Sequence, residues 1–160
     1  MTKYDELVTK AQELGIDVYE LPFKGNSGFY FDNTILISKN ITDIEKCCIM
    51  YEELGHHFTT YGDISDQKKI ENRKQELLAR RWGYSHAIKL THLINAYNNG
   101  LNEKFETSEF LDITQEFLEG TIQHYKNKYG AYLETDDYYI FFEPTINIVY
   151  KDEVKEALQK

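Results

Sequence analysis

The sequence predicts an α+β protein in which helices with a small antiparallel sheet are followed by a helical segment and a β-hairpin. Two observations carry this prediction. Apolar residues recur at alternating steps of three and four in several stretches, as they do along one side of a helix. Short runs rich in aromatic and β-branched residues flank two-residue turns, as in hairpins. Apolar residues make up 41% of the 160, which is enough to build a packed core.

The first 40 residues predict one helix and three strands. Residues 2–14 form an amphipathic pattern that Gly15 ends, since glycine readily takes the left-handed conformation after a helix. Residues 17–21 predict a short strand. Residues 29–31 and 34–38 flank Asp32-Asn33, a hairpin turn signal.

Residues 41–60, ITDIEKCCIMYEELGHHFTT, predict the central helix. Thr42 is an expected N-cap, and Glu45 three residues later completes a capping box. No proline interrupts the stretch, and a periodic apolar stripe gives the helix a buried face. The stripe consists of Ile44, Cys47, Tyr51, Leu54 and Phe58.

The same helix carries a metal-site pattern. Glu52 and His56 are separated by one turn, so their side chains stack on the flank of the apolar stripe. Two metal-ligand types at i and i+4, with Glu53 directly after the first, have the layout of the HExxH helix of zinc hydrolases, in which the intervening Glu activates water. Here the first ligand position holds Glu52 in place of His.

A second helix is predicted from about residue 65 to residue 92. Glu76, Ala79 and Gly83 lie within an arc of roughly 60° on its helical wheel. Small residues at 79 and 83 would allow a close approach to another helix, which Glu76 needs in order to reach an ion held there. The alternative for Glu76 is a solvated charge on a charged helix.

EELGHH followed by QELLARRWGY resembles the ImmA/IrrE family of metallo-endopeptidases, many of which are encoded on phages and integrative mobile elements. The resemblance implies a zincin-like metallopeptidase core over residues 1–92, with Glu76 as the third metal ligand within an ExxA pattern. It also implies a protein substrate, the helix-turn-helix repressor of the same element. Some family members are regulators whose proteolysis is less established.

In a zincin-like fold the edge strand of a small sheet beside the metal helix can pair with an extended substrate. We expect the hairpin at residues 29–38 to provide this edge. An equally weighted alternative is that the hairpin only covers the core.

The leading hypothesis is a metal-dependent endopeptidase. Glu52, His56 and Glu76 would hold Zn²⁺ with a fourth coordination position open, and Glu53 would be the general base. Two carboxylates also raise the relative preference for Mn²⁺ or Fe²⁺. The alternative is a non-catalytic member that binds a regulator without cleaving it, and the carboxylate at position 52 supports this alternative.

Residues 93–160 form the second predicted region, which we expect to pack on the core. Residues 107–118 predict two short helices with a turn near Asp112, the second continuing to Tyr129, and residues 131–135 and 138–142 predict a hairpin. A winged-helix DNA-binding module has this order of elements, but acidic side chains outnumber basic ones in the helices, and DNA recognition needs Arg or Lys. We therefore interpret the region as packing or partner-binding, with an acidic DNA-binding regulator as a third hypothesis.

The net charge of −9 argues against nucleic-acid or anionic-membrane binding and permits a basic partner. No stretch is long and apolar enough for a membrane span or a signal peptide, so we expect a cytoplasmic protein.

Cys47 and Cys48 have no CxxC partner and are interpreted as core thiols, although Cys48 lies one turn before Glu52 and could approach the metal. His57 points about 100° away from His56, which favours a surface or supporting role. His86, His92 and His124 are interpreted as structural, with His86 as a substitute ligand if Glu52 does not bind.

Overall fold

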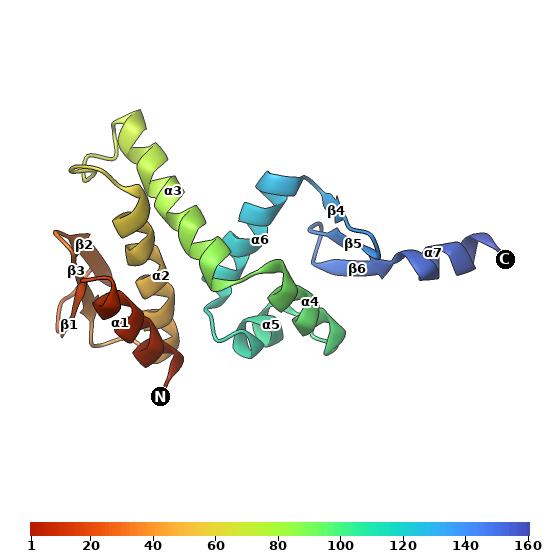
Figure 1. The fold of residues 1–160 in the computed structure, drawn as a ribbon, viewed down its shortest axis with the longest axis horizontal. Helices are drawn as coiled ribbons and strands as arrows, with labels where there is room; N and C mark the ends of the chain where they lie inside the picture. The colour runs from red at the N-terminus through yellow and green to blue at the C-terminus, as the bar shows by residue number, and fades with distance from the viewer. The chain divides into compact units, whose positions relative to one another are not determined.

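A computed structural model describes residues 1–160 and confirms the α+β class, with seven helices and two three-stranded sheets (Figure 1). The chain divides into two units, Met1–Ala87 and Ile88–Lys160. No helix in the structure has the length and apolar character needed to span a membrane.

The first unit contains three helices and one sheet. Its elements are α1 (Lys3–Glu13), β1 (Asp17–Leu21), β2 (Gly28–Phe31), β3 (Thr34–Ser38), α2 (Asp43–Thr59) and α3 (Ile70–Ala87). Thr2 and Thr42 cap α1 and α2, each within a capping box, and Gly15 follows α1 with φ +78°. The predicted Thr42 cap and the helix end at Gly15 are thus confirmed, whereas the Thr2 cap was not predicted.

The sheet of the first unit has the strand order β1-β3-β2. Asp32 and Asn33 both have positive φ, as a type I′ hairpin turn requires, so β2 and β3 pair antiparallel as predicted. The pairing of β1 differs from the expected antiparallel sheet, because β1 runs parallel to β3. The hairpin places β3 in the centre and leaves β2 at an edge.

The core of the first unit lies between the sheet and α1 and α2. Ile35 and Ile37 of the central strand are fully buried against these helices, together with Met50. α2 contacts β2 and β3 on one side and α3 on the other (Figure 1). The helix with the EELGH sequence is therefore enclosed by the sheet and by α3.

The helix predicted over residues 65–92 is shorter than expected and is interrupted. α3 begins only at Ile70, because turns held by side chains precede it; the Asn72 amide, for example, donates to the Asp66 carbonyl. The chain then breaks at Ile88-Lys89, where Lys89 is extended and the hydroxyl of Tyr125 donates to the Ile88 carbonyl at 2.5 Å. Helical periodicity cannot predict this hydrogen bond, because its two partners lie far apart in the sequence.

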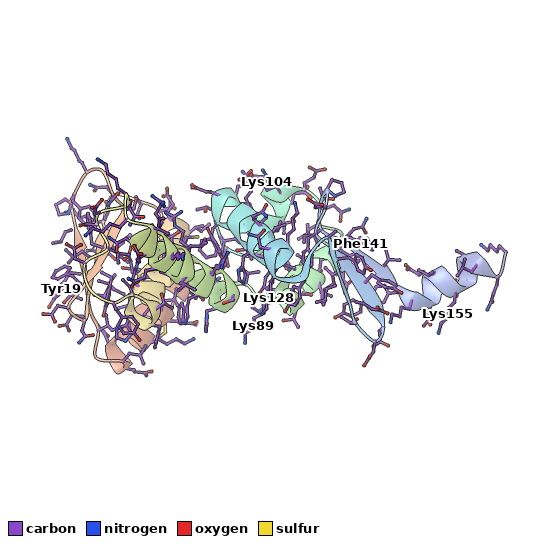
Figure 2. The ribbon with its side chains drawn as sticks, turned by 90° about the horizontal axis from the view of Figure 1, so that it is seen from above. Tyr19, Lys89, Lys104, Lys128, Phe141 and Lys155 are labelled. Atoms are coloured by element: carbon purple, nitrogen blue, oxygen red, sulfur yellow. The ribbon has the colours of Figure 1, made fainter.

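The second unit contains four helices and one antiparallel sheet of order β4-β5-β6. Its elements are α4 (Leu90–Asn98), α5 (Lys104–Phe110), α6 (Gln115–Tyr129), β4 (Tyr132–Glu134), β5 (Tyr138–Phe141), β6 (Asn147–Tyr150) and α7 (Lys151–Leu158). Figure 2 shows Phe141 on β5 and Lys155 on α7. The helix pair and the hairpin are as predicted, whereas β6 was not expected.

Candidate functional site

The site begins with a close contact between the backbones of α2 and α3. A Cβ atom at Gly55 would overlap the carbonyl oxygen of Ala79, and one at Gly83 would lie 3.0 Å from the carbonyl oxygen of Tyr51. Ala79 itself is fully buried. The close approach predicted from Ala79 and Gly83 is thus confirmed, and Gly55 inside the EELGH sequence completes it from the α2 side.

This contact brings His56 of α2 next to Glu76 of α3. The distance from His56 Nε2 to Glu76 Oε2 is 3.3 Å. His56 Nδ1 is 2.9 Å from the hydroxyl oxygen of Thr60, one turn later. If Nδ1 carries the proton and donates it to Thr60, Nε2 presents its lone pair toward Glu76, which is the form of histidine that binds metals.

Burial lowers the pKa of His56, and the charge of Arg80 lowers it further, against the opposing effect of Glu76. The neutral imidazole is favoured as a result. Arg80 follows Glu76 by one turn of α3, and its Nε lies 3.3 Å from Glu76 Oε1. The two oxygens of the Glu76 carboxylate therefore face different partners, His56 and Arg80.

Glu53 is a buried carboxyl beside this pair, with only 7% of its surface exposed. Burial, followed by the negative charges of Glu52 and Glu76, raises its pKa to about 8. Strand β2 passes close above it, since a Cβ at Gly28 would lie 3.1 Å from Glu53 Oε1. A carboxyl with so high a pKa in a cleft is a candidate for proton transfer.

A cleft of about 980 Å³ unites these groups. Its walls are β2, α2, α3 and the segment that connects α2 to α3. Glu52, Glu53, His56, Glu76 and Arg80 all line it. Glu52 is half-buried in this lining, but the structure contains no group of three or more His, Cys, Asp or Glu side chains placed to hold a metal ion. Of the three predicted ligands, His56 and Glu76 are brought together and Glu52 lies apart in the same cleft.

The pair formed by His56 and Glu76 fits a zinc ion. Two donors that each lie about 2.0–2.1 Å from a tetrahedral zinc ion are about 3.3–3.4 Å apart. The observed separation of 3.3 Å matches this spacing. Imidazole nitrogen and carboxylate oxygen are also both ordinary zinc donors. The residues present therefore fit a metal, with Glu52 in the lining of the same cleft as the candidate for the third donor.

Three supporting residues were not singled out from the sequence. Thr60 holds His56, Arg80 contacts Glu76, and the hydroxyl of Tyr30 on β2 lies 2.8 Å from His57 Nδ1 on α2. The interaction between Tyr30 and His57 ties the edge strand to the helix and gives His57 a supporting place away from His56. Thr60 and Arg80 each follow a predicted ligand by one helical turn, and this spacing was the available sequence signal for both.

The remaining candidates lie elsewhere. His86 is exposed and stacks on Trp82, with ring centroids 3.8 Å apart, and it is not among the residues that line the cleft. Cys47 and Cys48 are buried, and Cys47 packs in the core of the first unit.

Comparison with known proteins identifies the family of the chain. No curated protein and no solved structure matches the chain. The family described as IrrE N-terminal-like domain, Peptidase_M78, matches residues 11–123, which is well over half of the chain and includes α2 and α3. The protein therefore belongs to the IrrE N-terminal-like family of peptidases, as the EELGHH and QELLARRWGY sequences led us to expect.

Proposed function

We propose that the protein is a metal-dependent endopeptidase whose metal ligands are Glu52, His56 and Glu76 and whose general base is Glu53. The observation that carries the proposal is the 3.3 Å approach of His56 Nε2 to Glu76 Oε2 beside the buried carboxyl of Glu53 in one cleft. The family match supports the reaction class.

A bound divalent ion would polarise the peptide carbonyl and the attacking water. Zn²⁺ suits the imidazole of His56, and Mn²⁺ or Fe²⁺ are alternatives because two of the three donors are carboxylates. Thr60 keeps the His56 ring oriented by its contact with Nδ1.

Glu53 would take a proton from the attacking water and deliver it to the leaving amine. Its pKa of about 8 reflects burial and the charges of Glu52 and Glu76. A cation between those two carboxylates offsets their charges and brings the pKa of Glu53 down toward neutrality, where a carboxylate can act as a base.

The substrate we propose is the helix-turn-helix repressor of the mobile element that encodes the protein. An extended segment of that repressor would pair with the free edge of β2, which lies over Glu53 and lines the cleft. The net charge of −9 favours a basic substrate over an acidic one.

One alternative function has an observation of its own. Because no set of three donors is assembled and Arg80 pairs with Glu76, the protein could bind a regulator in the cleft without cleaving it. Turnover distinguishes the two functions.

Elemental analysis of protein purified without a His tag or chelator tests the metal. We expect about one divalent ion per chain, and strong loss of it in His56→Ala and in Glu76→Ala, because an open three-ligand site has no spare donor. Unchanged metal content in both variants would contradict the site.

Cleavage tests the reaction, with internally quenched peptides and the cognate repressor as substrates. Glu53→Gln keeps the shape of the side chain but cannot accept the proton, so cleavage should be lost while metal content stays at the wild-type level. If wild type cleaves neither substrate with any of the three metals, the binding function is favoured instead.

A further inference from the structure

Arg80 is a cation in the cleft that the proposed reaction does not yet use. Its Nε pairs with Glu76 Oε1 at 3.3 Å, and the side chain is 53% exposed where it lines the cleft. The structure gives this guanidinium no other ion pair and no hydrogen bond. Its Nη groups are therefore available to a bound molecule, in a side chain that carries five donors in a planar fork.

The position of Arg80 follows from that of Glu76. One oxygen of the Glu76 carboxylate faces His56 and the other faces Arg80, so the guanidinium lies directly beside the proposed ligands. Arg80 occurs one turn after Glu76 on a helix whose position is fixed by the Gly55 and Ala79 contact.

The charge of Arg80 has a specific use in this chain. Two carboxylates and one imidazole neutralise a divalent ion, whereas the HExxH layout with two imidazoles and one carboxylate leaves one positive charge. A site with Glu52 as a ligand thus has one positive charge fewer than the HExxH layout, and the guanidinium of Arg80 lies beside Glu76 in the same cleft. A preorganised cation placed where negative charge develops is among the strongest contributions to catalysis.

We propose that Arg80 is a catalytic residue that donates from its Nη groups to the scissile carbonyl oxygen as that oxygen becomes negative, compensating for the carboxylate of Glu52. This role rests on the proposed peptidase function. A solvent-exposed ion pair at i and i+4 that only stabilises the helix has a different signature, because its removal leaves both metal affinity and turnover nearly unchanged.

Arg80→Gln separates these roles through two independent measurements. Competitive zinc titration should show zinc binding that is roughly three- to tenfold tighter, since removal of a neighbouring cation favours a divalent ion. With the quenched peptide that wild type cleaves fastest, kcat should fall by roughly 100-fold with little change in KM.

Arg80→Lys should recover part of kcat, because it keeps the charge and loses the fork. Arg81→Gln is the matched control: Arg81 is the next residue of α3 and does not line the cleft, so both measurements should stay at wild-type values.

Glu52→His tests the compensation directly. In the Glu52→His variant the metal site keeps a positive charge of its own. The roughly 100-fold loss of kcat that Arg80→Gln causes in wild type should therefore shrink to roughly tenfold or less in this variant. Equal losses in the two backgrounds would show that Arg80 does not compensate for Glu52.

The outcomes separate this role from the proposed function. Wild type that binds no metal, or binds metal and cleaves nothing, overturns the peptidase and the role of Arg80 with it. If wild type cleaves, but Arg80→Gln keeps its kcat within twofold of wild type or binds zinc more weakly, only the proposed role of Arg80 is overturned.

Discussion

Each unit of the protein contains a cleft, and the two clefts differ in how their charged side chains are arranged. The cleft of the first unit gathers Glu52, Glu53 and Glu76 with a single arginine, and one of these carboxyls is buried with a pKa of about 8. The cleft of the second unit, about 660 Å³, has a floor of Leu93, Leu118 and Phe142. Its charged residues form ion pairs, Lys104 with Glu119 and Lys126 with Glu143.

This difference bears on where reactive groups are to be expected in the chain. Charge that is buried among like charges is costly for the fold and is retained where chemistry needs it. Ion pairs at the surface change the free energy of folding only slightly in either direction. We therefore expect the reactive groups to lie in the first unit, where they lower its stability, whereas the charged pairs of the second unit are those of ordinary packing. Three substitutions, two of them with a comparison variant, test this difference.

The largest effect is expected from Gly55→Ala. The new methyl group overlaps the Ala79 carbonyl oxygen, so α2 and α3 must separate, and we expect a loss of about 4 kcal/mol in the free energy of unfolding. Gly83→Ala should cost clearly less, because its Cβ would lie 3.0 Å from the Tyr51 carbonyl oxygen. Denaturant unfolding of both variants measures the order. Equal stability of Gly55→Ala and wild type would mean that the helices do not touch there.

The next effect is a gain in stability from Glu53→Gln in metal-free protein. The folded-state pKa of Glu53 is raised to about 8, above an unfolded value of about 4.3, so wild type loses stability as pH rises between those values. Gln does not titrate, and the variant should be more stable by on the order of 3 kcal/mol at pH 8, with the difference vanishing near pH 4.

Glu20→Gln is the control of opposite sign. The hydrogen bond from Lys46 lowers the pKa of Glu20, so its contribution is present above the unfolded pKa and is lost as pH falls through the folded pKa. Glu20→Gln should therefore destabilise the protein at neutral pH and converge with wild type in acid. Unfolding curves at a series of pH values measure both variants, and parallel curves for Glu53→Gln and wild type would contradict the burial of an ionisable Glu53.

The smallest effect is expected in the second unit, from Tyr125→Phe. The variant loses the hydrogen bond from the Tyr125 hydroxyl to the Ile88 carbonyl, and its free energy of unfolding should be lower by about 1 kcal/mol. Because Tyr125 belongs to the second unit and does not line the cleft that contains Glu53, peptide cleavage should be unchanged. A large loss of cleavage with little loss of stability would instead place reactivity under the control of the second unit.

Local sequence signals predicted much of the fold. The Thr42 and Glu45 capping box, the left-handed Asp32-Asn33 turn and the left-handed Asp112 before α6 each depend on residues close in the chain. The interruption at Ile88 could not be predicted in this way, since its partner Tyr125 is 37 residues away. β6 was missed because four residues between a proline segment and a helix show too little alternation.

The candidate site was predictable to a similar limit. Spacing within one helix placed Glu52, Glu53 and His56 on a common cleft, and the small residues of α3 indicated the approach of Glu76. The orientation of Glu52 and the pairing of Arg80 with Glu76 depend on packing between two helices and on side-chain rotamers. Periodicity fixes the face of a helix on which a residue lies and does not fix the direction of its outermost atoms.

The contact of Gly55 with Ala79 also bears on how such a site can change over evolutionary time. The separation of α2 and α3 is fixed by backbone atoms one residue before His56 and three residues after Glu76, and no ligand side chain takes part in that contact. Substitution at position 52 therefore alters the donor without moving the scaffold. The residue at position 52 and neighbouring charges such as Arg80 can therefore change in this chain while the two helices keep the same distance.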